Sequence, residues 1–219
     1  MDQNVILVET VPLEFDLESL GCRLRIRPGQ TKFMDRLSRL AEEAVRVARP
    51  KAVARLCGLT ILDEENVQVG EVTFSSPLLR QKMDGLGRAF PYLASEGTEL
   101  ADWSLSLSSS LEQVFASALR EVAVQQAENL LERTLLERYG IAQVSAMNPG
   151  SLKVWSLEEQ VPLFELLAPL PEKLGVTLLP SLMMRPEYSV SGVFFQTDSK
   201  FYNCQLCPKK ECPNRRTPS

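Results

Sequence analysis

The clearest pattern along the chain is a run of thirty residues, 110–139, in which apolar positions recur with the period of a helix. One face of this run carries Leu111, Phe115, Ala118 and Val122. Ser109 and Glu112 have the spacing of a capping box at its start, and Gly140 stands where a left-handed glycine commonly ends a helix. We therefore predict one helix of roughly 45 Å, which would lie across a sheet or bridge two halves of a domain.

The remaining pattern predicts shorter helices and several strands. Helical periodicity predicts helices over 31–49, 76–85 and 156–168. Runs rich in β-branched and apolar residues predict strands within 4–15 and at 51–62, 67–74, 90–94, 176–184 and 189–196. Residues 142–151, which contain Asn148-Pro149-Gly150, are predicted to form a loop. Helices and strands do not alternate strictly, so their order favours an α+β fold over a doubly wound sheet.

Composition and charge narrow the classes of protein. The chain of 219 residues has a net charge of −4, which argues against a general nucleic-acid binder. No run approaches the roughly 18 consecutive apolar residues of a membrane span. The first residues, Met1 to Asn4, lack the basic start and the apolar run of a signal peptide. We therefore expect a cytoplasmic protein that binds neither membrane nor nucleic acid.

The chain contains no histidine, and this absence excludes several mechanisms. A Ser-His-Asp triad and a Cys-His pair both need an imidazole as the general base. No histidine is present to bind zinc or iron.

Three cysteines near the C-terminus have a spacing typical of metal ligands. Cys204, Cys207 and Cys212 follow the pattern C-x2-C-x4-C. Three interpretations remain open: an iron–sulfur cluster suited to electron delivery, a structural zinc ion, or free thiols. A fourth ligand would come from Cys22, Cys57, a small molecule or a partner protein. Without such a role, Cys22 and Cys57 are expected to be core residues, where free cysteine usually lies.

The C-terminal third resembles the reactivation domain of cobalamin-dependent methionine synthases. The resemblance is carried by the turn at Gly150, Ser-Val-Ser-Gly at 189–192, Phe-Phe at 194–195 and Asp-Ser-Lys-Phe-Tyr at 198–202. The order and spacing of these motifs hold over about sixty residues, 137–202. The stretch from Ser-Val-Ser-Gly to Asp-Ser-Lys is the more specific part.

This resemblance implies a bent antiparallel sheet flanked by helices over residues 1–202. The Cys-rich tail over 203–219 has no counterpart in the standard reactivation domain, and in this respect the sequence is more similar to free-standing relatives. The resemblance also implies a free-standing protein that supports reductive activation of cobalt. In the family, the domain docks over the corrinoid while an electron is delivered, and S-adenosylmethionine methylates the reduced cobalt. The expected partner is a corrinoid protein, or a truncated methionine synthase without a reactivation domain. This partner carries the cobalamin, because a chain without histidine cannot supply a histidine axial ligand to cobalt.

The resemblance further implies ligand-binding roles for Glu137, Gly150, Ser151 and Tyr202. Three positions depart from the family pattern. Ala146 occupies the place of an arginine that binds S-adenosylmethionine, and Ser151 occupies that of a tyrosine. Phe201 lacks the hydroxyl group of the tyrosine that the family tends to have there. The lost arginine contact would weaken binding on the order of 10- to 100-fold. An alternative is therefore a non-catalytic binding module or scaffold, with a metal at its cysteines and an eroded S-adenosylmethionine site. Gly150 alone is equally consistent with a plain turn.

Overall fold

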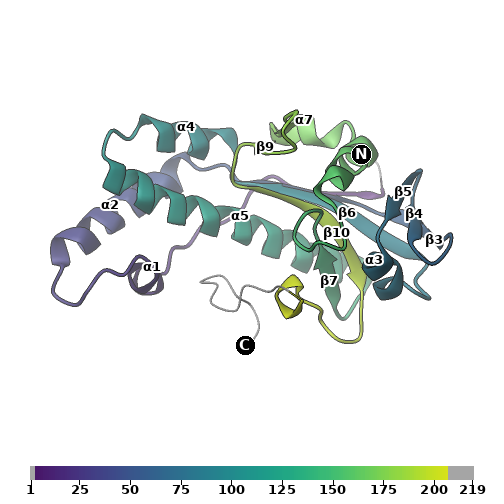
Figure 1. The fold of residues 1–219 in the computed structure, drawn as a ribbon. Coiled ribbons are helices and arrows are strands. Elements are labelled where there is room, and N and C mark those ends of the chain that lie inside the picture. The colour runs from purple at the N-terminus through teal and green to yellow at the C-terminus, as the bar shows by residue number, and fades with distance from the viewer. Residues whose placement is uncertain (1–2, 207–219) are drawn as a thin grey trace.

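The structure, a computed structural model, describes residues 3–206 and consists of an antiparallel sheet with helices on both faces. The sheet lies toward one end of the molecule, and a group of helices extends from it at the other end (Figure 1). This arrangement confirms the predicted α+β class. Within the described residues, no helix combines the length and hydrophobicity needed to cross a membrane.

Eight strands form the main sheet, and every pairing between them is antiparallel. They are β1 (Val5–Val8), β2 (Lys51–Arg55), β3 (Cys57–Ile61), β4 (Asn66–Val69), β5 (Val72–Ser75), β6 (Arg88–Ser95), β7 (Val144–Met147) and β10 (Ser189–Gln196). The central strand β6 pairs with β2 and β3 along one edge and with β10 along the other. β7 then pairs with β10. Two short strands, β8 (Thr177–Leu178) and β9 (Met184–Arg185), pair separately.

Seven α-helices and two short 3₁₀ helices lie within the described residues. They are α1 (Leu17–Arg23), α2 (Thr31–Val47), α3 (Pro77–Lys82), α4 (Thr98–Ser106), α5 (Ser110–Tyr139), η1 (Leu157–Glu159), α6 (Gln160–Leu167), α7 (Leu170–Leu174) and η2 (Asn203–Gln205). Helix α5 covers one face of the sheet, whereas α3, α6 and α7 pack on the opposite face. Helices α2 and α4 pack against the N-terminal part of α5, and α1 packs against α2.

The length of α5 follows from its two packing partners. Near its start, Phe115 and Leu119 are buried against α2 and α4 in a core made of helices. Further along, Leu131 and Leu135 are buried against strand residues such as Phe90. The helix ends as predicted at Gly140, which adopts the left-handed conformation. Helix α5 thus joins the group of helices α1, α2 and α4 to the sheet, which confirms the prediction of a helix that bridges two parts of the fold.

Several strand predictions need correction. The stretch 51–62 is interrupted at Leu56, whose N–H bonds to the Asn4 carbonyl oxygen at 2.7 Å, and it therefore forms both β2 and β3. The stretch 67–74 turns at Gly70, where φ is +60°, and forms β4 and β5. The predicted strand at 176–184 is extended only near its two ends, where β8 and β9 lie. The predicted loop 142–151 contains strand β7, because it pairs with β10.

The predicted capping box at the start of α5 is wrong. Ser109 precedes the helix, but its side chain makes no capping hydrogen bond. Glu112 instead forms ion pairs with Arg39 at 2.7 Å and Arg36 at 3.2 Å, both on α2. Glu112 therefore links α5 to α2, instead of bonding to the backbone at Ser109 as a capping box requires.

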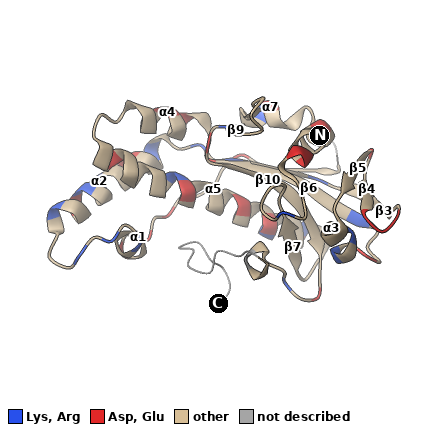
Figure 2. Cartoon of the chain, viewed as in Figure 1, with Lys and Arg blue, Asp and Glu red and all other residues tan. Residues whose placement is uncertain are grey.

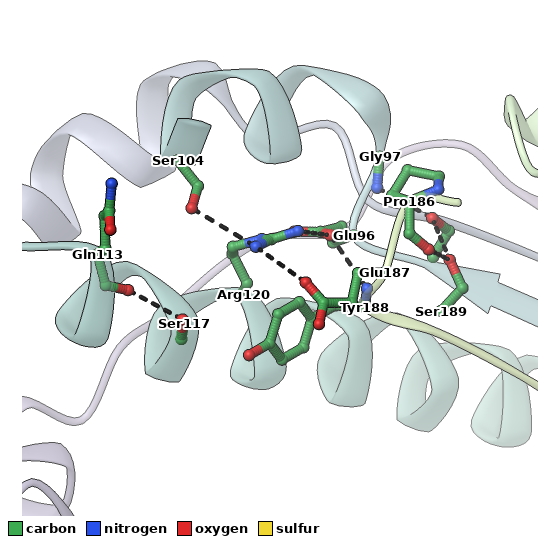
Figure 3. A network of polar contacts seen from close by, with 11 residues as sticks. Glu96, Gly97, Ser104, Gln113, Ser117, Arg120, Pro186, Glu187, Tyr188 and Ser189 are labelled. Atoms are coloured by element: carbon green, nitrogen blue, oxygen red, sulfur yellow. Dashed lines mark hydrogen bonds and ion pairs between the residues drawn. The ribbon is translucent and has the colours of Figure 1, made fainter. Parts of the chain in front are cut away.

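A buried ion pair joins α5 to the end of β6. Arg120 donates to both carboxylate oxygens of Glu96, at 2.6 and 2.7 Å, and Glu96 is fully buried (Figure 3). The Tyr188 N–H also donates to Glu96 at 3.2 Å, and the Arg120 guanidinium lies 4.4 Å from the Tyr188 ring centre. Burial raises the pKa of the Glu96 carboxyl, and Arg120 opposes that rise. The pair therefore holds α5, β6 and the segment entering β10 in one arrangement.

We expect Arg120→Met to lower the free energy of unfolding by about 3–5 kcal/mol, because it leaves the Glu96 carboxylate buried without its cation. Urea denaturation followed by circular dichroism measures this change. The double variant Glu96→Gln with Arg120→Met removes both charges and should recover part of the loss. Equal stability of the wild type and Arg120→Met would contradict this role.

Candidate functional site

The candidate site is a cavity of about 190 Å³ where α5, β7, β10 and the segment after β10 meet. We call it the relay pocket. Its walls are formed by Glu128, Glu132, Ala146, Asn148, Val190, Phe194, Lys200, Phe201, Tyr202 and Asn203. A larger hollow of about 590 Å³ lies between residues 11–16 and α5. The relay pocket is the better candidate because side chains distant in sequence converge there in one hydrogen-bonded chain.

This chain of hydrogen bonds joins three residues of the pocket wall, Asn203, Asn148 and Glu128, through the buried Tyr92. The Asn203 amide donates to Asn148 Oδ1 at 3.0 Å, and the Asn148 amide donates to the Tyr92 hydroxyl at 2.8 Å. The Tyr92 hydroxyl donates to Glu128 Oε1 at 2.7 Å. Asn148 also donates to the Ser191 carbonyl oxygen at 2.9 Å, which ties the chain to β10. The relay therefore fixes the orientation of side chains from four separate segments.

One buried polar atom at the relay pocket has no partner. Among the described residues, no group donates a hydrogen bond to Asn203 Oδ1, although this atom is buried. A buried acceptor without a donor costs on the order of 1–3 kcal/mol. A ligand that carries an N–H or O–H group would remove that cost.

Gly192 allows β10 to lie close to the relay. A Cβ atom at this position would lie 2.4 Å from the Met147 carbonyl oxygen and 2.6 Å from Asn148 Nδ2. It would also lie 2.9 Å from a ring carbon of Tyr92, which stacks on Phe194 with ring centres 3.9 Å apart. The glycine of the Ser-Val-Ser-Gly motif is therefore required by close packing.

The charged groups of the pocket come from α5 and from the segment after β10. Lys200 forms an ion pair with Glu132, and the exposed fractions of the two side chains are 31% and 21%. The Lys200 ammonium also lies 5.8 Å from the centre of the Tyr202 ring. Acidic residues recur along α5 (Figure 2), and two of them, Glu128 and Glu132, are one helical turn apart on the wall of the pocket.

Of the four ligand-binding residues implied by the resemblance, the structure places one at the relay pocket. Tyr202 forms part of its wall. Glu137 is exposed on the last turns of α5, outside the pocket wall. Gly150 has a φ of +76° in a turn, where its N–H bonds to the Trp155 carbonyl oxygen at 2.9 Å. Ser151 is exposed in the same turn. The ligand roles of all four residues, Tyr202 included, stay predictions.

Two departures from the family pattern lie on the pocket wall. Ala146 contributes no charge there. Phe201 is buried in the core beneath the pocket, its N–H donates to Ser145 Oγ at 2.7 Å, and the Lys82 ammonium lies 4.7 Å from its ring centre. Phe201 therefore fixes the start of the segment that carries Tyr202 and Asn203.

Five polar residues of the relay pocket were not predicted as site residues: Glu128, Glu132, Asn148, Lys200 and Asn203. Glu128 and Glu132 have the four-residue spacing that puts two carboxylates on one helical face, a signal that was available. Lys200 belongs to the Asp-Ser-Lys motif, but its place on the pocket wall, paired with Glu132, is seen only in the folded structure. Asn148 was interpreted as a turn residue.

The cysteine prediction falls largely outside the described residues. Cys207 and Cys212 lie beyond residue 206, and the side chain of Cys204 is not described. Within the described part of the chain, no three potential ligand side chains are grouped so as to hold a metal ion. Cys22 is exposed, contrary to the expectation of a core position, whereas Cys57 is buried. The cluster, zinc and free-thiol interpretations all stay predictions.

Comparisons with known proteins support the fold. No protein-family model matches the sequence, and no curated protein is significantly similar to it. Among solved structures, the chain is similar to the crystal structure of the MetH reactivation domain bound to AdoHcy. The TM-score is 0.61 at 17% sequence identity, over 90% of this chain and 80% of that chain. The two therefore share an α+β fold with an antiparallel sheet flanked by helices.

We expect Gly192→Ala to lower the free energy of unfolding by about 1–3 kcal/mol, because the added methyl group would overlap the Met147 carbonyl and displace Asn148. Thermal and urea denaturation measure this effect. Gly58→Ala is the matched control, since Gly58 also lies in a strand and a Cβ there meets nothing within 4 Å. A loss of similar size in both variants would contradict the close-packing argument.

We expect iodoacetamide to modify Cys22 rapidly and Cys57 only slowly in the folded protein. Cys22 is exposed, whereas burial raises the pKa of the Cys57 thiol and keeps it protonated and covered. Peptide mass spectrometry at successive times gives the two rates, and unfolding in urea should make them similar. Equal rates in the native protein would show that Cys57 is not buried as described.

Proposed function

We infer that this protein is an accessory factor for a corrinoid protein or for a truncated cobalamin-dependent methionine synthase, supporting the reductive activation of cobalt. Its relay pocket binds S-adenosylmethionine or its product, AdoHcy. S-adenosylmethionine supplies a methyl group, and the residues of this chain bind and orient it. The cobalamin belongs to the partner protein. The cysteines at 204, 207 and 212 hold an iron–sulfur cluster or a zinc ion in this proposal.

The observation that carries the proposal is the relay pocket, in a fold shared with a domain whose crystal structure contains AdoHcy. The pocket residues fit one end of such a ligand. Glu128 and Glu132 suit an ammonium group, Lys200 suits a carboxylate, and the unpaired Asn203 Oδ1 suits a donor. Their carboxylate, ammonium and amide groups match the polar groups of an amino acid.

A second candidate function is a binding module or scaffold for a corrinoid protein, without catalysis. The observation that favours it is Ala146, which gives the pocket wall no cation where the family has an arginine. The two functions differ in one measurable respect. An accessory factor accelerates cobalt reduction and methylation, whereas a scaffold binds the partner and leaves both rates unchanged.

The test uses the full chain, made without oxygen, and the cobalamin-binding region of a methionine synthase without a reactivation domain. The inactive Co(II) form is mixed with a one-electron reductant and S-adenosylmethionine, and visible absorbance follows methylated cobalamin. We expect the chain to raise its rate of formation at least about tenfold, because positioning two reactants lowers the barrier. Iron, zinc and sulfide contents are measured on the same preparation.

Matched asparagine variants separate the relay pocket from the rest of the surface. Asn203→Ala removes the unpaired acceptor and should reduce the acceleration, whereas Asn129→Ala on the exposed side of α5 should not. Complex formation without any acceleration would favour the scaffold. If the chain neither binds the cobalamin-containing protein nor changes its spectrum, the accessory function is refuted.

A further inference from the structure

We propose that Lys200 and Glu132 recognise the amino-acid end of the ligand, with Lys200 holding its α-carboxylate and Glu132 its α-ammonium. The assignment rests on the proposed function, because it takes an S-adenosyl compound as the ligand of the relay pocket. It identifies Lys200, on the segment after β10, as the cation that serves in place of an arginine at Ala146.

The charges on the pocket wall match those of an α-amino acid. Among the described residues, the wall contains one cation, Lys200, and two carboxylates, Glu128 and Glu132. The α-carbon of the ligand carries one carboxylate and one ammonium group, so it needs one partner of each sign. Glu128 already accepts a hydrogen bond from Tyr92 and is 8% exposed. Glu132 is therefore the more accessible carboxylate for the ammonium group.

The ion pair between Lys200 and Glu132 can exchange partners with such a ligand. Both side chains keep part of their surface accessible, 31% and 21%. When the ligand carboxylate contacts Lys200 and its ammonium contacts Glu132, each protein group exchanges one partner of opposite sign for another. No charge is then left unpaired in a partly buried site, which avoids the main cost of inserting a charged ligand. Either end of the ligand alone would leave one protein charge without a partner.

The size of the pocket fits the amino-acid end better than the whole ligand. Pockets that enclose a drug-sized molecule measure roughly 300–1,000 Å³, whereas this one measures about 190 Å³. The adenosine therefore extends beyond it. The Tyr202 ring, whose centre lies 5.8 Å from the Lys200 ammonium, forms the wall beside the charged groups. Recognition of the amino-acid end and of adenosine should thus be separable.

Calorimetric titration with two probes tests the assignment. AdoHcy carries the amino-acid end, whereas 5′-methylthioadenosine has the same adenosine and thioether without it. We expect Lys200→Met to weaken AdoHcy binding about 10- to 100-fold, since one charge-assisted contact is lost. Its affinity for 5′-methylthioadenosine should stay unchanged. Lys200→Arg keeps the cation and should retain most of the AdoHcy affinity.

Arg23→Met is the matched control. It breaks the ion pair between Arg23 on α1 and Glu121 on α5, whose exposed fractions, 30% and 31%, are similar to those of the Lys200 pair. Both probes should bind this variant as they bind the wild type. If Lys200→Met binds AdoHcy like the wild type, or loses both probes equally, the role of Lys200 is overturned and the proposed function stands. If the wild type binds neither probe, the ligand in the proposed function is itself wrong.

Discussion

The buried ion pair between Glu96 and Arg120 fixes the geometry on which the candidate site depends. It joins the end of β6 to α5, and Glu96 also accepts the Tyr188 N–H just before β10 begins. The same three elements carry the relay and its pocket. Tyr92 of the relay lies on β6, Glu128 and Glu132 lie on α5, and β10 forms part of the pocket wall. An uncompensated charge in this position is costly, so the pair defines one relative placement of helix and strands.

Close packing at Gly192 then completes the pocket. Because residue 192 has no side chain, β10 lies against β7 and Asn148 reaches Tyr92. The hydrogen bonds from Asn203 to Glu128 run through these two residues. The polar groups of the relay are therefore held by hydrogen bonds and close packing, whereas the ion pair of Lys200 on the pocket wall is partly exposed. A fixed relay beside exchangeable charges is suited to binding a small zwitterionic group.

Local features of the sequence predicted α5, its end at Gly140 and the α+β class, because helical periodicity and a left-handed glycine act over a few residues. Strand β7 was missed because its partner, β10, follows more than forty residues later. The capping-box prediction was wrong for a similar reason. Glu112 pairs with Arg39 on α2, a partner that is distant in the sequence. The resemblance drew attention to Tyr202, which lies on the pocket wall and whose ligand role stays a prediction. The convergence of Lys200 with Glu132 depends on the tertiary fold.

The most direct test of the account is a nuclear magnetic resonance titration of the full chain with AdoHcy, followed through backbone amide shifts. If the relay pocket binds AdoHcy, the largest shifts should cluster there, on residues 128–132 of α5, 146–148 and 190–203. Shifts confined to the larger hollow beside residues 11–16 would place a ligand elsewhere. An unchanged spectrum at millimolar AdoHcy would contradict the central claim that this pocket is a binding site.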